Sequence, residues 1–481
     1  MISAPSLEMA VLVLGVFVLM AEAFAETLDK RSLAIIGICG LCAVLVASFF
    51  LAPPPAAAAT GFWSFYTADP LAVFFKRFAL VTTILVLILM IDYAPVVRQS
   101  IHGATHQAGL GEFFALPLFT CAGLMWMASA IDFVMIFVSL EVVTMSFYVL
   151  VAFTRRNPAS LEAGVKYLIL SALSTGFLVY GITWIFGVTG ETNLARIGEV
   201  LRGSAVEQGP ALFGMALVLV ALGFKVAAVP FQIWVPDVYQ GAPTPVTAYL
   251  SVGSKAAGFV VLLRVLAPFF MLPQIQRLLV VIAALTLLYG NLAALPQTNL
   301  KRLLAYSSIA HAGYLLIGVV CLAGAAVSFY LVSYLLMTML SFAILIVVAR
   351  ETGDRIEDFN GLAARSPFLS FAMLLAMASL AGLPFTAGFL GKFFIFDAAI
   401  RQHQTGLVFV GVITVACGFY YYLKVVRAMY WETPVSSKAI PLSSLSRVTM
   451  ILLMAGIVLL GVCPQPILNA LRPRASANPT R

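Results

Sequence analysis

Charged residues are scarce in this sequence. Only 10% of its 481 residues are Asp, Glu, Lys or Arg, whereas 62% are hydrophobic. A soluble globular domain contains about 25% charged residues, and a water-soluble core of this size cannot absorb so much apolar surface. The composition therefore excludes a soluble globular protein and predicts a protein that is embedded in a lipid bilayer.

Residues that hold metals or cofactors are also few. The six cysteines include one Cys-x-x-Cys pair, Cys39 and Cys42, but the pair lies inside an apolar run and nothing nearby completes an iron–sulfur or zinc site. His102 and His106 have the i, i+4 spacing of metal ligands, again without further ligands. The glycines fall at helix-packing spacings and form no phosphate-binding loop. We therefore expect no metal and no cofactor on this chain.

Long hydrophobic runs are abundant. A membrane-spanning helix needs roughly 20 apolar residues, and the sequence predicts an all-α polytopic membrane protein with about 14 transmembrane helices. These helices are expected near residues 7–25, 33–52, 71–91, 113–130, 132–153, 163–188, 211–230, 244–266, 275–296, 300–322, 325–349, 367–399, 407–430 and 448–470.

The basic residues indicate the orientation of these helices. The net charge of +8 is scattered over short loops and forms no stripe, which argues against a nucleic-acid partner. One set of loops holds fourteen basic residues, and the other set, together with the termini, holds seven. Because cytoplasmic loops are enriched in Lys and Arg, the richer set is predicted to be cytoplasmic and both termini periplasmic.

Two similar segments indicate internal symmetry. The seven residues that end at Phe231 (KVAAVPF) resemble the seven that end at Phe385 (SLAGLPF), 154 residues and five predicted helices later. An odd number of crossings gives the copies opposite orientations, as in transporters with inverted repeats, and the proline of each copy breaks a helix. The predicted regions are helices 1–3 (1–112), repeat one with helices 4–8 (113–270), repeat two with helices 9–13 (271–430), and helix 14 with the tail (431–481).

Five charged residues inside apolar runs point to a function. Glu141, Lys166, Lys225, Lys255 and Lys392 lie in stretches that are otherwise hydrocarbon, although a charge at the centre of a membrane helix costs about 2.5–3.5 kcal/mol on insertion scales. A buried Glu and a buried Lys control each other's protonation. We therefore interpret Glu141 and Lys225 as the gate of a proton pathway.

The other positions extend this pathway. Lys255 lies in mid-span beside small residues that leave room for water, and Lys392, close to the second helix break, is the predicted exit-side donor. Lys166 lies about one turn from the start of its span, so that snorkelling to the surface is an alternative to a role in the pathway. His311 either relays a proton between its ring nitrogens or packs as a hydrogen-bonded core residue.

Several runs are similar to a known family. They are FK at 224–225, PFQIWVPDVYQGAPTP at 230–245, SSIAHAGY at 307–314 and LPFTAGFLGKF at 383–393. With Glu141 and Lys255, they resemble the antiporter-like subunits of proton-pumping NADH:quinone oxidoreductase, respiratory complex I, over nearly the whole chain. Within that group the DVYQGAP run and the lysine of the twelfth span, Lys392, are most similar to subunit N.

This resemblance implies a specific function. Members conduct protons from the cytoplasm past the residues that match Glu141 and Lys225, along a hydrated axis through those that match Lys255 and His311, and release them at the one that matches Lys392. The residue that matches Lys166 belongs to the same charged row. FMN, iron–sulfur clusters and quinone are held by other subunits.

The resemblance also implies a setting. The chain would be a non-redox subunit of the bacterial inner membrane that couples electron transfer from NADH to quinone to proton pumping. Its partners would be lipid and the other membrane subunits, especially neighbouring antiporter-like ones. One departure is Gln232, where many relatives have His, because an amide does not take up a proton at ordinary pH.

Two other functions stay open. A subunit of a multi-subunit cation/proton antiporter shares this layout and the Glu–Lys pair, although sodium transport favours clustered intramembrane oxygen ligands and the spans offer little acid besides Glu141. A non-conducting scaffold would use the lysines to fix helices through ion pairs. With one plausible acidic partner for four lysines, the sequence argues against a scaffold.

Overall fold

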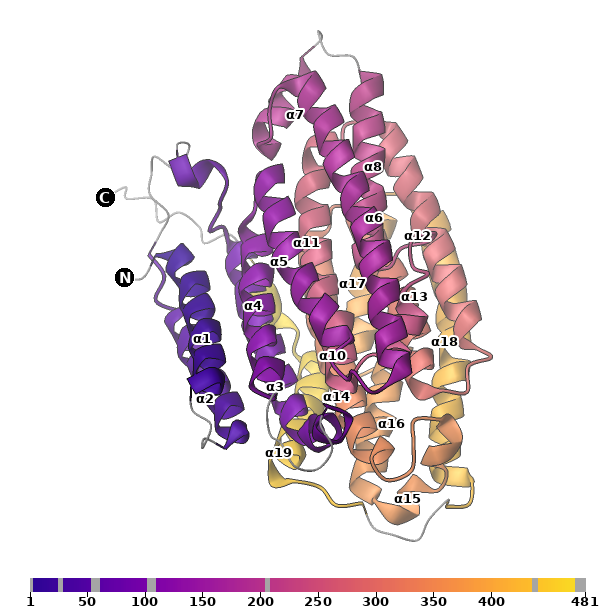
Figure 1. Cartoon of the computed structure of the whole chain (residues 1–481). Coiled ribbons are helices and arrows are strands. Elements are labelled where there is room, and N and C mark those ends of the chain that lie inside the picture. Colours follow the sequence, from indigo (N-terminus) through magenta and orange to yellow (C-terminus); the bar gives the residue numbers. More distant parts are fainter. Residues whose placement is uncertain are drawn as a thin grey trace, which may run out of the picture.

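The computed structural model describes residues 3–24, 29–52, 61–101, 110–203, 208–434 and 440–471. Throughout these ranges the chain is helical with short connections, and three isolated β-bridges join pairs of described residues. Figure 1 shows long helices that run side by side in one elongated bundle, with α1 (Ala4–Phe24) and α2 (Lys30–Ala47) at one side.

Thirteen helices of the described chain are long and apolar enough to cross a membrane. They are α1, α2, α3 (Pro70–Ile101), α4 (Leu110–Ser129), α5 (Phe133–Val151), α6 (Pro158–Thr189), α8 (Gln208–Val226), the continuous run from α10 (Thr244–Tyr249) through η2 (Leu250–Ser254) and α11 (Lys255–Leu266) to η3 (Ala267–Phe269), α12 (Pro273–Ala294), α13 (Leu300–Val320), α14 (Gly324–Ala349), α18 (Thr405–Trp431) and α19 (Ser444–Val462).

The span predicted at 367–399 consists of two shorter helices, α16 (Pro367–Ala381) and α17 (Ala387–Arg401). All fourteen predicted spans therefore coincide with helices, and the all-α polytopic membrane fold is confirmed. Short helices occupy the connections: η1 (Gly61–Ser64), α7 (Leu194–Arg202), α9 (Val235–Gly241), η4 (Ile356–Phe359), α15 (Leu362–Arg365) and α20 (Gln465–Ala470). The last predicted span was too long, because the chain leaves the helix before Pro464, which cannot continue it.

The junction between α4 and α5 is very short but separates two helices. Asp132 caps the start of α5, since its side chain accepts a hydrogen bond from the Val134 amide at 2.8 Å. The same carboxylate accepts a hydrogen bond from the Thr192 hydroxyl at 2.7 Å, which ties the junction to the segment before α7. The structure thus agrees with two spans at this point of the sequence.

Both similar segments interrupt a helix where the sequence predicts it. α8 ends at Val226, and Ala227 follows with a φ of 66°, before Pro230. α16 ends at Ala381 and is capped by Gly382, which has a φ of 93°, and Phe385 precedes α17 with a φ of 66°. These left-handed residues turn the chain out of the helix. The inverted relation of the two repeats and their boundaries stay predictions.

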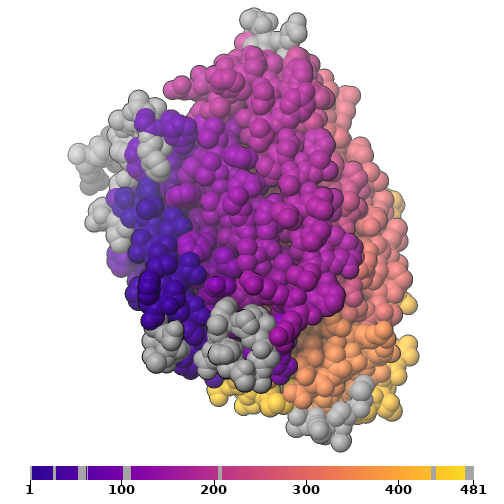
Figure 2. Space-filling model, viewed as in Figure 1, coloured from indigo at the N-terminus to yellow at the C-terminus, as the bar shows by residue number. Residues whose placement is uncertain are grey.

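The most buried helices form the centre of the bundle. The apolar window of α13 is buried completely, and that of α14 is 89% buried, whereas that of α6 is only 22% buried. Figure 2 shows one outer face of the bundle, which is covered largely by the magenta-coloured helices of the first half of the chain. Exposed residues of α6 include Val165, Ile169 and Leu173, as expected for a surface that faces lipid. Polar groups on α13 are therefore shielded from the bilayer.

Candidate functional site

Four of the six predicted site residues are buried in the bundle. Lys225, Lys255, His311 and Lys392 are between 1% and 6% exposed, each on or beside a central helix. A buried polar group without partners is costly, so its hydrogen bonds indicate what it can do. These four residues lie on helices that neighbour one another in turn, namely α8, α11, α13 and α17.

The first contact joins α5, α6 and α8. Lys225, the penultimate residue of α8, donates a hydrogen bond to the Thr144 hydroxyl at 2.8 Å. Thr144 follows Glu141 by three residues and therefore shares its face of α5. The Glu141 carboxylate accepts a hydrogen bond from Thr175 of α6 at 2.7 Å. Glu141 therefore lies one turn of α5 from Thr144, the residue that binds Lys225. Glu141 and Lys225 do not form a direct ion pair in the described part of the chain.

The second contact lies at a π-helical turn. η2 interrupts the span with one turn of π-helix directly before Lys255, and such turns are frequent at functional sites. Lys255 Nζ donates to the carbonyl oxygen of Ser308 at 2.6 Å and also contacts the Ser308 hydroxyl. Gly258, one turn after Lys255, lies against Lys225, because a Cβ at this glycine would be 3.5 Å from Lys225 Cγ. The stem of Lys225 therefore packs against α11, one turn from Lys255.

The third contact is centred on His311. Its Nδ1 lies 2.7 Å from the hydroxyl of Tyr330 on α14, and its Nε2 lies 3.1 Å from the hydroxyl of Tyr422 on α18. Tyr422 in turn contacts Ser307. His311 follows Ser308, the partner of Lys255, by one helical turn. Both ring nitrogens have partners that can donate or accept, an arrangement that fits a relay and also fits a packed core histidine.

The fourth contact is at the second helix break. Lys392 Nζ donates to the carbonyl oxygens of Leu380 at 2.9 Å and Ala381 at 2.8 Å, the last two residues of α16. These carbonyls lack helical partners and carry the negative end of the helix dipole, which stabilises an ammonium group. The same nitrogen lies 5.0 Å from the centre of the Tyr314 ring, one turn beyond His311.

Lys166 is placed differently from the other lysines. Its side chain is 40% exposed and pairs with Glu162 and Asp237, both at 2.7 Å. Asp237 also pairs with Arg302 at 2.9 Å. Burial raises the pKa of the Asp237 carboxyl, but the hydrogen bonds from Lys166 and Arg302 outweigh burial and hold this pKa below its usual value.

The expectation of a single acidic partner for four lysines was wrong, because Lys166 has two. Asp237 lies in the connection between two spans, outside the apolar runs of the sequence.

Gln232 is 5% exposed, and its amide oxygen accepts no hydrogen bond from the described residues.

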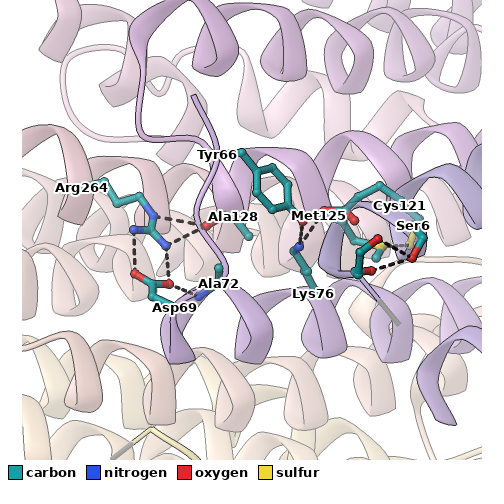
Figure 3. Close-up of polar contacts among 11 residues, drawn as sticks. Ser6, Tyr66, Asp69, Ala72, Lys76, Cys121, Met125, Ala128 and Arg264 are labelled. Carbon is teal, nitrogen blue, oxygen red and sulfur yellow. Dashed lines mark hydrogen bonds and ion pairs between the residues drawn. The ribbon is translucent and has the colours of Figure 1, made fainter. Parts of the chain in front are cut away.

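Sequence reasoning also missed an ion pair between α1 and α3. Lys76 and Glu8 are fully buried and 2.7 Å apart, and Tyr66 contacts both. Figure 3 shows Tyr66 and Lys76 of this cluster beside a second pair, Asp69 with Arg264. The signal was present, since Glu8, Lys76 and Arg264 all fall inside predicted apolar spans.

Metal ligands are not gathered anywhere in the described ranges: no group of three or more His, Cys, Asp or Glu side chains is arranged to hold an ion. His102 and His106 lie outside the described residues. Whether the chain holds a cofactor stays a prediction.

Comparisons with known proteins agree with this architecture. A family model described as NADH:quinone oxidoreductase/Mrp antiporter, TM, matches residues 130–418. NADH-quinone oxidoreductase subunit N of Desulforamulus reducens is 38% identical over 96% of this chain and 95% of its own. The corresponding subunit of Trichlorobacter lovleyi is 39% identical over 88% of this chain and 86% of its own.

Solved structures are similar over almost the whole length. A chain of respiratory complex I from Thermus thermophilus has a TM-score of 0.81 and 33% identity, with 97% of this chain and 99% of that chain covered. A chain of the Mrp complex from a Dietzia species shares the fold, with a TM-score of 0.79, 21% identity, and 97% and 96% of the two chains covered. The protein described here belongs to the NADH-quinone oxidoreductase subunit N family of antiporter-like membrane subunits.

Proposed function

We propose that this chain moves protons across the membrane along the row from Glu141 to Lys392, driven by electron transfer from NADH to quinone on partner subunits. The observation that supports this proposal is the order of these residues across neighbouring helices. Lys225 lies against the turn of Lys255, Lys255 bonds to Ser308, and His311 and Tyr314 follow Ser308 at one-turn intervals up to Lys392. A structural role for isolated lysines would not require this order.

The gate is Lys225, whose ammonium group can bind either of two side chains on one face of α5, Thr144 or Glu141. On Thr144, as seen here, Lys225 has a neutral hydrogen-bond acceptor and lacks direct contact with an acid. A buried ammonium without a counter-ion is costly, so in this arrangement Lys225 tends to pass a proton on. When its nitrogen moves one turn toward Glu141, the carboxylate stabilises the ammonium and Lys225 is reloaded.

In the central part of the row, the proton is transferred from Lys255 to His311. Lys255 holds its proton against the oxygens of Ser308, and the hydroxyls of Tyr330 and Tyr422 flank the two nitrogens of His311. A hydroxyl accepts and donates in the same step, so each can pass a proton without becoming charged. Water between the side chains completes the steps that direct contacts do not span.

Lys392 is the exit-side donor in this proposal. The two carbonyls at the end of α16 hold its ammonium in place until release. Release leads to the side opposite the cytoplasm, in line with the predicted periplasmic termini and the bacterial inner membrane. A cluster of charged side chains would form the cytoplasmic entrance of the pathway; it consists of Asp237, Lys166 and Arg302. Lys166 therefore acts at this entrance and not inside the row.

Redox chemistry and its cofactors are assigned to partners. FMN, iron–sulfur clusters and quinone would be bound by other subunits, and neighbouring antiporter-like subunits would contact this chain within the membrane. The energy required is modest, since moving one charge across 100 mV corresponds to about 2.3 kcal/mol. Opening and closing one buried ion pair supplies a free energy of this order.

The proposal is tested by replacing Lys225 with Ala in the assembled complex in sealed vesicles. NADH-driven acidification should slow at least about tenfold, a barrier increase of about 1.4 kcal/mol, while the complex still assembles. Lys424→Ala is the control, because Lys424 likewise donates one neutral hydrogen bond, to the backbone carbonyl of Gln297, but lies outside the row. Wild-type pumping by the Lys225 variant would refute the gate.

The cation/proton antiporter alternative has one observation in its favour, the shared fold with the Mrp complex. Sodium distinguishes the two. If the chain moves protons for the oxidoreductase, NADH-driven acidification should be the same in sodium-containing and sodium-free potassium buffers. Acidification that requires sodium, or sodium uptake that accompanies NADH oxidation, would support the alternative.

A further inference from the structure

The buried cluster of Glu8, Tyr66 and Lys76 has no place in the row described above. Lys76 Nζ lies 2.7 Å from Glu8 Oε1, and the Tyr66 hydroxyl donates to the same oxygen at 3.0 Å while it accepts from Lys76 (Figure 3). Both charged side chains are 0% exposed. The three groups therefore form a connected, buried triad of acid, hydroxyl and base, with Glu8 on α1, Lys76 on α3 and Tyr66 in the connection before α3.

Each member of the triad suits proton exchange. Glu8 Oε2 has no hydrogen-bond partner among the described residues, so the carboxylate keeps one acceptor position open. Burial raises the pKa of the Tyr66 hydroxyl, which therefore stays neutral and can pass a proton only by accepting and donating together. A pair whose only role is to fix helices gains nothing from an open acceptor position, because buried polar atoms are normally saturated.

The triad is part of a polar stripe on α3. Asp69, Lys76 and Thr83 are spaced seven residues apart, which places them on one face at intervals of about 10 Å. Asp69, just before the helix, is 38% exposed and forms a two-pronged ion pair with Arg264 of α11, at 3.0 and 2.8 Å. The stripe thus begins at the surface, on the side of the membrane where α3 starts.

The other end of the stripe contacts the span that carries Lys255. Thr83 shares a hydrogen bond of 2.7 Å with the hydroxyl of Tyr249. Tyr249 directly precedes the π-helical turn that leads to Lys255. A cavity of about 10 Å³, with room for about one water, lies between α3, α4 and the span of Lys255; its walls are apolar and include Ala79, Ala128 and Gly253. The Ala128 carbonyl accepts hydrogen bonds from Arg264 at the surface end.

We propose that Glu8, Tyr66 and Lys76 form a proton-exchange site on a side branch that leads from Lys255 along α3 to the Asp69–Arg264 pair. The inference rests on the proposed function of the main row. In one exchange Lys76 gives a proton to the Tyr66 oxygen while the Tyr66 hydroxyl gives its proton to Glu8, so that both charges are neutralised and no proton is gained. Glu8 then releases its proton to water toward Asp69, and Lys76 takes one from the Lys255 side, which restores the ion pair.

The decisive variant is Tyr66→Phe in the whole complex. It keeps the ring and the direct Lys76–Glu8 ion pair, so a purely structural pair is left intact, but it removes the hydroxyl that accepts from Lys76 and donates to Glu8. We expect NADH-driven acidification of vesicles to slow at least about twofold, with NADH oxidation by an artificial acceptor unchanged. The matched control is Tyr180→Phe, because Tyr180 is 53% exposed on the outer face of α6.

A second measurement addresses the acid directly. Infrared difference spectra recorded during turnover should contain a carboxylic acid band that disappears in the Glu8→Gln variant. Pumping by Tyr66→Phe at the wild-type rate, or spectra in which no band depends on Glu8, would overturn the side branch. If Lys225→Ala stops pumping while Tyr66→Phe does not, the main row stands and only the side branch fails. If neither variant affects pumping, both proposals fail.

Discussion

Lys225 and Thr144 are joined by a hydrogen bond of 2.8 Å across the α5–α8 interface, one helical turn from Glu141. The lysine at the gate is therefore held by a hydroxyl and not by the nearby carboxylate. Thr144 also donates to the carbonyl oxygen of Leu140 at 2.6 Å, so its position on α5 is fixed. The contact defines a state in which Lys225 is buried without an acidic partner, and this state can be shifted by changing Thr144.

Replacing Thr144 with Val should slow proton transfer through Lys225. Valine has nearly the same shape but no oxygen, so Lys225 loses its second partner, and leaving a buried donor unsatisfied costs about 1–3 kcal/mol. The ammonium is then held more tightly by Glu141. We expect NADH-driven proton pumping in vesicles to slow about tenfold or more. Thr144→Ser restores an acceptor and should pump nearly as the wild type does; equal slowing in both variants would contradict this account of Thr144.

Tyr330→Phe tests whether His311 relays protons or only packs. The substitution removes the hydroxyl 2.7 Å from His311 Nδ1 and leaves the ring in place. A packing role predicts a small loss of stability, about 0.5–1.5 kcal/mol for one hydrogen bond, with normal pumping. A relay predicts slower pumping at unchanged assembly, and this is the outcome we expect. Thermal unfolding and vesicle acidification, measured on the same preparation, separate the two.

Much of the fold was predictable because hydropathy and helix breakers act locally. Apolar runs located the spans, and the two Pro-containing segments located the breaks before Pro230 and after Gly382, where the backbone turns out of the helix. The π-helical turn before Lys255 had no such signal. It depends on how α10 and α11 pack against their neighbours, which hydropathy does not describe.

The site was predictable in its charges but not in its contacts. A lysine in an apolar run is visible in the sequence, whereas its partner lies on another helix, often far along the chain. Thr144 is 81 residues from Lys225, and Tyr422 is 111 residues from His311. Threonine and tyrosine are common in membrane helices and do not stand out alone. Glu8 and Lys76 did carry a visible signal, since both are charges inside apolar runs.

Asp237 provides a pH-dependent contribution to stability. Its ion pairs with Lys166 and Arg302 hold its pKa below the ordinary value of 3.8 in the folded protein. The stabilisation is therefore present above that value and is lost as the pH falls through the lower folded pKa. Because the carboxylate is 36% exposed, screening limits the effect to about 1 kcal/mol or less.

The variant Asp237→Asn should therefore be slightly less stable than the wild type at neutral pH, and the difference should vanish in strongly acidic buffer. Thermal unfolding of the complex at several pH values measures this. Asp397→Asn is the matched control, because Asp397 forms one exposed pair with Arg401 within the same helix. A stability difference that grows as the pH falls would contradict the assignment.

Gly382→Ala should disturb the exit site through the backbone. Gly382 has a φ of 93°, a backbone angle that residues with a Cβ rarely adopt. An added Cβ would lie 3.2 Å from Lys392 Nζ. The strain costs about 1–2 kcal/mol, and relief of the close contact moves Lys392 off the carbonyls of α16. We expect lower stability in thermal unfolding and slower proton release in vesicles.

Gly187→Ala is the control. Gly187 lies in α6 with nothing within 4 Å of an added Cβ, so Ala there should stabilise the helix by up to about 1 kcal/mol. A Gly382→Ala protein that unfolds and pumps like the control would show that the left-handed turn is not needed to hold Lys392.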